Sequence, residues 1–273
     1  MKVIQAKSAG FCYGVQRAVE LAEQTARERG GCVMLGSIIH NAHVVQHLEQ
    51  LGAHQVAGPE EIRPGDTVLI RAHGEKKQVI GHLKDIGAEC VDATCPNVLR
   101  VQQIVAQADA EGRVPIIIGD PNHPEVMGVA SWSARSVVFE GAETLQRWLD
   151  EDPARRELPL TAVAQTTCIR IIWDGAAEIL KKQCTNAKIF DTICNATHKR
   201  QSEAAELASQ VDVMVVVGDR KSANTKHLTE ICSRQCPAVY QIERAEELKR
   251  DFLTGCSVAG LTAGASTPAG IIK

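Results

Sequence analysis

The chain has 273 residues, of which 44% are hydrophobic and 23% charged, and its formal net charge is −3 at pH 7. These values predict a globular protein with a substantial core, built as one large domain or as two to three small ones. The weak negative charge gives no electrostatic basis for binding nucleic acid or an anionic membrane, and no run of about 18 apolar residues predicts a membrane span.

Apolar runs of strand length alternate along the chain with amphipathic stretches of helix length. The predicted strands are 2–5, 32–35, 67–70, 115–118, 137–139, 160–164, 211–217 and 257–261. The predicted helices include 14–29, 97–110, 142–149 and 169–183, and a further helix that ends near residue 50. Continuous apolar strands between helices are typical of parallel sheets covered on both faces, so the predicted fold class is α/β.

A cysteine stands at three places where an apolar strand stops and a helix starts. The three are Cys12, Cys95 and Cys194, each followed by a β-branched residue three positions later and by a base two positions after that. This repeat predicts three related α/β units, at 1–95 with the N-terminal strand and Cys12, at 96–192, and at 193–273.

These three cysteines are candidate metal ligands. Helix N-termini favour the thiolate over the thiol, and three thiolates rather than four indicate an iron–sulfur cluster with one iron open for chemistry. The alternative for each is a small buried residue. The N-terminus shows no signal-type segment, so a cytoplasmic location is expected, in which cysteines stay reduced. The other seven are interpreted as core or surface thiols: Cys32, Cys90, Cys168, Cys184, Cys232, Cys236 and Cys256.

Polar residues with chemical capability follow strand after strand. They are His40, His73, His123, Glu125, Thr166, Ser222, Asn224 and Ser266. Ligands of parallel sheets bind beyond the carboxyl ends of the strands, so these residues are expected to line one pocket facing the cysteines, although each alone also fits a turn or a helix cap.

The composition of this predicted pocket indicates an anionic ligand. Histidines, hydroxyl groups, an amide and helix N-termini suit a phosphate or diphosphate. The sequence contains neither a Walker-type pattern nor a dinucleotide glycine pattern, which disfavours ATP and NAD. A three-histidine zinc site formed by His40, His73 and His123 is an alternative.

Together with the residues around them, the three cysteines and the polar residues that follow the strands closely resemble the LytB/IspH family of 4-hydroxy-3-methylbut-2-enyl diphosphate reductases. The resemblance spans nearly the whole chain, in the family's order, and its most specific part is three cysteines combined with His123-Pro124-Glu125. The other matching segments are Gly10–Val15, His40-Asn41, Ala72–Gly74, Asp92–Pro96, Gln165–Thr167, Ile193–Thr197, Ser222–Asn224 and Thr262–Ser266.

The resemblance implies a pseudo-threefold cloverleaf of three α/β units around a central [4Fe–4S] cluster. Carried over by position, Cys12, Cys95 and Cys194 hold the cluster. Glu125 supplies protons, and Thr166 lies beside the substrate hydroxyl. The diphosphate is bound by His40, His73, His123, Ser222, Asn224 and Ser266.

The implied reaction is the last step of the non-mevalonate isoprenoid pathway. It is the reductive dehydroxylation of (E)-4-hydroxy-3-methylbut-2-enyl diphosphate to isopentenyl and dimethylallyl diphosphate at the open iron, with electrons from a ferredoxin or flavodoxin. No nucleic-acid or membrane partner is expected. Two alternatives remain: a non-redox hydro-lyase with the same cluster, and a metal-stabilised binding or sensor protein.

The chain departs from the family pattern at three points. Ala223 replaces a serine between Ser222 and Asn224, which removes one hydroxyl from the expected diphosphate site. Asp219 places an acid close to the same site. The sequence ends at Lys273, soon after Ser266, where family members usually continue into a further segment.

Overall fold

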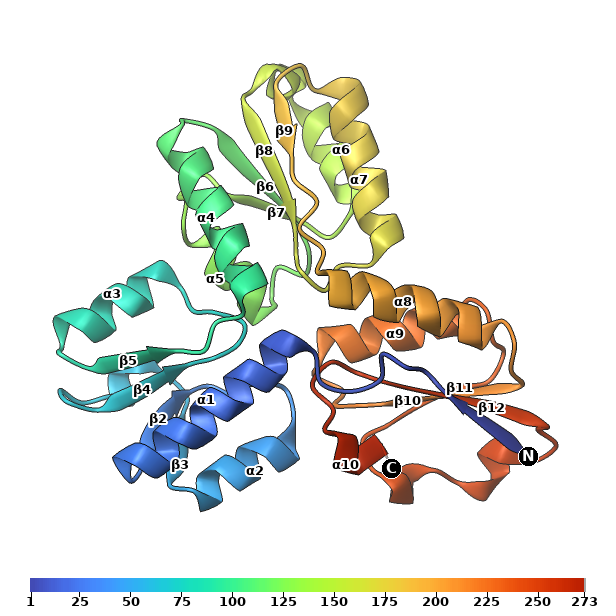
Figure 1. Cartoon of the computed structure of the whole chain (residues 1–273). Helices are drawn as coiled ribbons and strands as arrows, with labels where there is room; N and C mark the ends of the chain where they lie inside the picture. The colour runs from blue at the N-terminus through green and yellow to red at the C-terminus, as the bar shows by residue number, and fades with distance from the viewer. Residues whose placement is uncertain (273) are drawn as a thin grey trace. The chain divides into compact units, whose positions relative to one another are not determined.

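The structure is a computed structural model that describes residues 1–272, and Lys273 lies outside them. The described residues form three four-stranded sheets, in which every strand pair is parallel (Figure 1). They divide into two compact units. The first unit contains residues 1–16, 39–46 and the chain from Cys194 onward, and the second contains 17–38 and 47–193.

One sheet of the second unit has the order β3-β2-β4-β5. Its strands are Ala53–Val56, Cys32–Leu35, Thr67–Ile70 and Glu89–Asp92. Helix α3 (Lys77–Asp85) covers one face, where Leu83 packs with Val33, Val68 and Ile70. The helices α1 (Tyr13–Arg29) and α2 (Ala42–Gln50) begin in the first unit and end in the second.

The other sheet of the second unit has the order β7-β6-β8-β9 and is covered on both faces. Its strands are Val137–Phe139, Val114–Ile118, Leu160–Ala164 and Ala187–Ile189. Ile117 and Val163 pack with residues of α4 (Pro96–Ala110) and α5 (Pro124–Ala130). Ile116 and Ile118 point to the other face, into a cluster with α6 (Ala142–Glu151) and α7 (Arg170–Gln183). This alternation is what a parallel strand buried on both sides requires.

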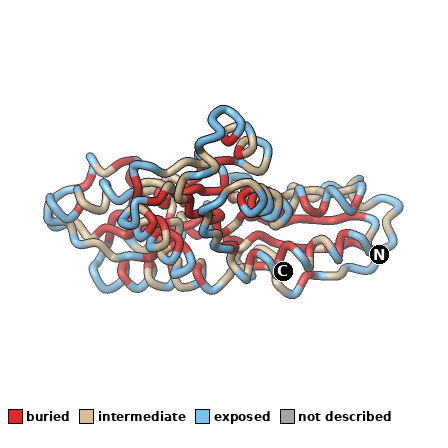
Figure 2. The backbone as a smooth tube through the Cα atoms, turned by 90° about the horizontal axis from the view of Figure 1, so that it is seen from above, coloured by how far each residue is buried: buried red, intermediate tan, exposed pale blue. Residues whose placement is uncertain are grey.

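The sheet of the first unit has the order β1-β12-β10-β11. Its strands are Lys2–Gln5, Val258–Ala263, Val213–Val217 and Val239–Ile242. Met214 and Val216 pack with residues of α8 (Asn195–Ala208) and α9 (Ala223–Ser233) on one face. Val215 and Val217 pack on the other face with Ile272 of the short α10 (Ala269–Ile272). Along the helices, buried and exposed segments alternate, as expected for helices with one covered face (Figure 2).

The N-terminal strand lies in a different sheet from the one predicted. β1 pairs in parallel with β12, from Lys2 opposite Val258 to Gln5 opposite Leu261, whereas the prediction placed it in the unit 1–95. The reason is tertiary: Ala6, just after β1, is buried in the core cluster that contains Ala204 and Leu207 of α8. A short strand of four residues carries no sequence signal for its partner.

Three α/β units with parallel sheets are thus confirmed. Apart from the place of β1, the unit limits 1–95, 96–192 and 193–273 stay predictions, as does the cloverleaf arrangement. The polar stretch 150–157 completes α6 and forms the 3-10 helix Pro153–Glu157 inside the second unit. Within residues 1–272, no helix is both long and apolar enough to cross a membrane.

Candidate functional site

The three repeated cysteines stand at helix N-termini, as predicted. Cys12 directly precedes α1, while Cys95 and Cys194 occupy the N-cap positions of α4 and α8. Among the described residues, neither N-cap cysteine uses its side chain to cap its helix, and all three are partly exposed. Partly exposed thiols at these positions fit the soft sulfur ligation of an iron–sulfur cluster.

The first unit contains Cys12 and Cys194 together with His40, Ser222, Asn224 and Ser266. The second unit contains Cys95 together with His73, His123, Glu125 and Thr166. The convergence of all three cysteines on one centre therefore stays a prediction.

Four of the other seven cysteines have the environment of structural thiols. Cys32, Cys168, Cys232 and Cys236 are buried, and no cysteine within residues 1–272 forms a disulfide. Burial raises the pKa of Cys168 to about 12, and also that of Cys232 to about 12. These thiols stay protonated at neutral pH and are poor metal ligands.

In the second unit, Glu125 and Thr166 form a buried pair. Glu125 lies in the first turn of α5, after β6, and Thr166 follows β8, the neighbouring parallel strand. The Thr166 backbone N–H donates to Glu125 Oε1 at 2.6 Å, and the Thr166 hydroxyl donates to Oε2 at 2.8 Å. The carboxyl group thus bridges to a second strand end, which a simple helix cap does not do.

Glu125 is the carboxyl group whose titration is most suited to acid catalysis. Only 2% of the residue is exposed, and burial raises its pKa from 4.5 to about 7, although the two hydrogen bonds from Thr166 act in the opposite direction. A pKa near neutrality allows a carboxyl group to give up a proton and regain it under physiological conditions.

His123 and His73 meet edge to face beside this pair, with ring centroids 5.3 Å apart. The backbone N–H of Glu125 donates to His123 Nδ1 at 3.1 Å. A nitrogen that accepts a hydrogen bond carries no proton, so the proton of neutral His123 is on Nε2. This tautomer makes Nε2–H a donor for an anionic ligand.

In the first unit, two predicted diphosphate-binding residues have buried polar atoms that need a partner. Asn224 and Ser266 are 5% and 6% exposed, and neither Asn224 Nδ2 nor Ser266 Oγ has a hydrogen-bond partner within the described part of the chain. Ser222 differs, because its hydroxyl oxygen accepts from the Thr225 N–H at 3.4 Å and caps α9. Unsatisfied buried donors are costly, and a bound anion would satisfy them.

Gly218 brings the loops of these residues together. It follows β10 with φ +150°, and a Cβ there would lie 2.6 Å from Thr225 Oγ1 and 2.9 Å from Thr267 Oγ1. Thr225 follows Asn224 and Thr267 follows Ser266, so a larger residue at 218 would separate the two segments.

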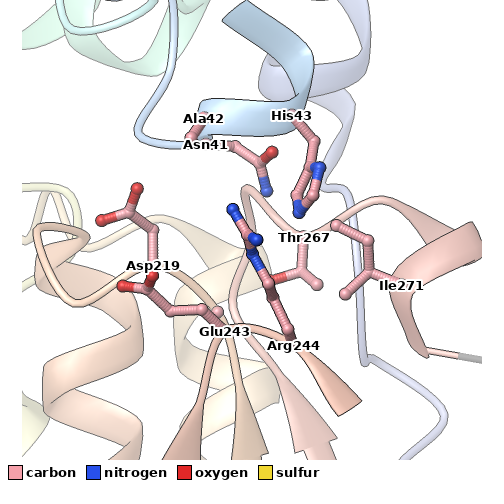
Figure 3. Close-up of a pocket in the computed structure, with 9 residues that line it drawn as sticks. Asn41, Ala42, His43, Asp219, Glu243, Arg244, Thr267 and Ile271 are labelled. Atoms are coloured by element: carbon pink, nitrogen blue, oxygen red, sulfur yellow. The ribbon is translucent and has the colours of Figure 1, made fainter. Parts of the chain in front are cut away.

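Next to these loops is a small cavity of about 30 Å³, lined by residues that include Asn41, Gly218 and Thr267. Figure 3 shows Arg244 extending toward Asn41 and His43, with Asp219 and Glu243 on its other side. A cavity of this volume has room for on the order of one water molecule. Asn41 itself caps α2 by accepting from the Val44 N–H at 3.2 Å, and it donates to the Ser266 carbonyl at 3.0 Å.

The two departures near the diphosphate site have local explanations. Asp219 accepts a hydrogen bond from the Lys221 N–H at 2.6 Å and so stabilises the turn after β10. Ala223 is the first residue of α9, where Ser222 already provides the cap. The neighbouring Arg220 forms exposed ion pairs with Glu243 and Glu247.

Two buried polar residues, Gln165 and Arg200, were not predicted as candidate site residues. Gln165 is buried between Asp120 and Thr167, where it accepts from the Asp120 N–H at 3.1 Å and donates to the Thr167 hydroxyl at 3.0 Å. Arg200 is buried on α8, whereas the base expected from the repeat, Lys199, is exposed. The sequence signal that could have indicated Arg200 is a charged residue on the same helix face as the apolar residues Ala204 and Leu207.

The chain is similar to known proteins over its whole length. The model of the LytB protein family matches residues 3–273. A curated 4-hydroxy-3-methylbut-2-enyl diphosphate reductase from Caldanaerobacter subterraneus subsp. tengcongensis is 39% identical over 278 residues, covering 100% of this chain and 94% of that protein.

Two solved structures are also similar. One is a structure of (E)-4-hydroxy-3-methyl-but-2-enyl diphosphate reductase, called the terminal enzyme of the non-mevalonate pathway. It has a TM-score of 0.70 at 38% identity and covers 100% of this chain and 96% of that chain. The other, E-1-hydroxy-2-methyl-but-2-enyl-4-diphosphate reductase from Plasmodium falciparum, has a TM-score of 0.93 at 26% identity and covers 99% and 85%.

Proposed function

Because the chain belongs to the LytB family, we propose that Cys12, Cys95 and Cys194 hold an iron–sulfur cluster with which it reduces (E)-4-hydroxy-3-methylbut-2-enyl diphosphate. The predicted family, enzyme class and reaction are confirmed by relatives that carry this reductase's name over the full length of the chain. Beyond the family and the reaction, we propose the cluster and the roles of individual residues.

The observation that carries the proposed mechanism is the buried Glu125–Thr166 pair. The reaction consumes two electrons and two protons: the carbon–oxygen bond of the 4-hydroxyl group breaks, the oxygen leaves as water, and a proton adds to the allylic carbon skeleton. Glu125 is placed to supply a proton because its pKa is raised to about 7. Thr166 orients both carboxyl oxygens, and its hydroxyl is the group that would meet the substrate hydroxyl.

The diphosphate is assigned to the set of donors carried over from the family. His123 offers its Nε2–H, since Nδ1 already accepts from the Glu125 backbone. Asn224 and Ser266 offer the buried polar atoms that have no partner within residues 1–272. His40, His73 and Ser222 complete the predicted set. Donors held before the ligand arrives lower the cost of binding, because their own desolvation is already complete.

The cluster, when bound through the three cysteines, would supply electrons and Lewis acidity to the reaction. A reductase also needs an electron donor, and we assign a reduced ferredoxin or flavodoxin to this role. The cytoplasmic location expected from the sequence stays a prediction.

Turnover of the allylic diphosphate under anaerobic conditions tests the proposed function. Protein supplied with a reduced one-electron donor is expected to form isopentenyl and dimethylallyl diphosphate, and protein without the donor is expected to form neither. Product formation independent of the donor would instead support the hydro-lyase alternative, and tight binding of the diphosphate without any product would support a binding or sensor protein.

A further inference from the structure

Arg200 is a charged residue in an apolar position. It lies on α8, whose N-terminus carries Cys194, and only 3% of it is exposed. Its helix neighbours on the same face, Ala204 and Leu207, belong to the core of the first unit. Burying a guanidinium is costly unless hydrogen bonds and opposite charges offset the loss of water, so its surroundings must contain specific partners.

Two of these partners are backbone carbonyls just before Cys12. Arg200 Nε donates to the Ser8 carbonyl at 3.0 Å, and Nη2 donates to the Gly10 carbonyl at 2.7 Å. The loop that leads into Cys12 is thereby tied to the helix that starts at Cys194. Cys12 and Cys194 lie far apart in the chain, so their spacing depends on tertiary contacts, of which these two hydrogen bonds are examples.

Glu203, one turn further along α8, holds the same loop from its amide side. Its Oε1 accepts from the Lys7 N–H at 2.6 Å and its Oε2 accepts from the Ser8 N–H at 2.8 Å, with the Ser8 hydroxyl as a third donor. Arg200 therefore binds the carbonyls of the loop while Glu203 binds its amides. Together, Arg200 and Glu203 hold carbonyl and amide groups of the backbone that precedes Cys12.

The other side of the Arg200 guanidinium has no such partner. Nη1 is buried and makes no hydrogen bond to any residue from 1 to 272. Burial lowers the pKa of Arg200, and the electrostatic interaction with Cys12 and Cys194 acts in the opposite direction. A buried, charged group whose Nη1 has no hydrogen-bond partner among the described residues is thus tied to the loop before Cys12, on the helix that begins after Cys194.

A related contact occurs in the second unit. Arg17 donates from Nη1 to the Thr94 carbonyl at 3.2 Å and from Nη2 to the Asp92 carbonyl at 3.4 Å, in the loop just before Cys95. An arginine bound to carbonyls that precede a repeated cysteine therefore occurs in each unit. Arg200 is the more deeply buried of the two.

We propose that Arg200 is a positioning residue for the metal centre: it fixes Cys12 relative to Cys194, and its permanent charge raises the reduction potential of the cluster that they hold. The inference rests on the proposed function, because it requires those cysteines to be ligands. Its charge stabilises the reduced cluster, since reduction adds one negative charge in a region of low dielectric constant.

Anaerobically reconstituted Arg200→Gln and Arg200→Lys proteins test this inference. The measurements are iron and sulfide content, the midpoint potential by a redox titration followed by electron paramagnetic resonance, and the rate of iron loss to a chelator. We expect Arg200→Gln to lower the equilibrium constant for one-electron reduction at least about tenfold, which corresponds to about 59 mV. Arg200→Lys retains the charge but not the fork, so we expect a potential near that of the wild type and iron loss at least about fivefold faster.

Arg113 provides a matched control. It is 7% exposed and donates to the carbonyls of Leu160 and Asn186, at the amino ends of β8 and β9 in the second unit. Arg113→Gln also removes a buried guanidinium from backbone carbonyls, but at the opposite ends of the strands from Glu125 and Thr166. Both Arg200→Gln and Arg113→Gln are expected to lower the midpoint temperature of thermal unfolding. Arg113→Gln is expected to leave the reduction potential of the cluster unchanged.

Several results would overturn the inference. An unchanged potential in loaded Arg200→Gln, an equal shift in Arg113→Gln, or an equal shift in Arg200→Lys would each remove the electrostatic role. If Arg200→Gln accumulates without cluster, Arg200→Lys decides alone: wild-type iron retention in that variant contradicts the positioning role. A wild-type chain that takes up no iron and sulfide would contradict the proposed function itself, whereas a loaded wild type with unaffected variants contradicts only this inference.

Discussion

Glu125 shows how a single residue acquires its role from two neighbouring strands. It follows β6 and is bonded to Thr166 after β8, so the parallel pairing of these strands creates the contact. The sequence indicated Glu125 and Thr166 separately, as polar residues after strands. Their pairing required the strand order β6-β8, which the sequence does not state.

Replacing Glu125 by Gln separates its two possible roles. The amide keeps the shape and an acceptor for the Thr166 N–H, but it has no titratable proton. We expect an intact cluster, substrate binding within about tenfold of wild type, and kcat reduced at least about a hundredfold, as is typical for loss of a positioned acid. Steady-state kinetics and the visible spectrum check this outcome. Near wild-type kcat would mean that another acid acts, and His123 would be the next candidate.

The pH dependence of turnover follows from the same residue. Below a pKa of about 7 Glu125 holds its proton and can donate it, and above that pH it loses it. We expect kcat to fall as the pH rises through about 7, and this limb to be absent from the residual activity of Glu125→Gln. The dependence of kcat on pH, measured for both proteins, tests this expectation. If kcat falls in the same way at alkaline pH in both proteins, another group is responsible for the fall.

Stability is linked to this pKa with a definite sign. The folded-state pKa of about 7 is above the unfolded value of 4.5, so the folded protein binds the Glu125 proton more tightly. The stabilisation is fully present below pH 4.5 and is lost as the pH rises through about 7. The difference in unfolding free energy between wild type and Glu125→Gln should therefore decrease over that range in urea titrations of the cluster-free proteins. A difference that grows with pH would show that the pKa is lowered instead.

The cysteines are separated into two groups by their place in the fold. Cys12, Cys95 and Cys194 begin helices, whereas Cys32 and Cys232 are buried in cores. Serine at any of the first three should abolish or strongly weaken cluster retention, because a hard oxygen replaces a soft sulfur. Serine at Cys32 or Cys232 should leave the iron content and spectrum of the folded protein unchanged. Equal losses in both groups would contradict the ligand assignment.

At the scale of elements, the central strands were predictable and most edge strands were not. The central strands β2, β6, β8 and β10 were predicted because they are continuous apolar runs with almost every residue buried. The strands β3, β5, β9 and β11 were missed, and all four lie at sheet edges. An edge strand is short and half-covered, so its residues alternate or are polar and give no strong pattern.

The turn after β10 gives a prediction at this scale. Gly218→Ala places a methyl group 2.6 Å from Thr225 Oγ1 in a backbone conformation that favours glycine. We expect a loss of about 1–3 kcal/mol in unfolding free energy and a raised KM for the diphosphate substrate, because Asn224 and Ser266 are separated. Gly255→Ala is the matched control, since a Cβ there meets no atom within 4 Å although φ is also positive. An equal rise in KM in both variants would contradict the argument.

For the whole molecule, the repeat of helix-initiating cysteines indicated the three α/β units, and the structure confirms three parallel sheets. The path of the chain between them was not predictable. β1 joins the last sheet, and residues 39–46 belong to the same compact unit as the C-terminal part. These exchanges depend on contacts between residues more than 150 positions apart, such as those of Ser8 with Arg200 and Glu203, and no local pattern contains them.

Exposure to oxygen tests the predicted open iron at the level of the intact protein. An iron atom without a protein ligand is accessible to oxidants, so air should abolish turnover while the fold persists. Activity and far-UV circular dichroism, followed in parallel after air exposure, check this expectation. Activity that survives for hours in air would indicate a fourth protein ligand.

The most direct test of the central claim is the iron and acid-labile sulfide content of anaerobically purified wild-type protein, read together with its visible spectrum. A [4Fe–4S] cluster predicts about four iron atoms and about four sulfide ions per chain, with a broad absorption that bleaches on reduction. Zinc in place of iron, bound without sulfide and without colour, would contradict the cluster and would instead favour the three-histidine alternative of His40, His73 and His123.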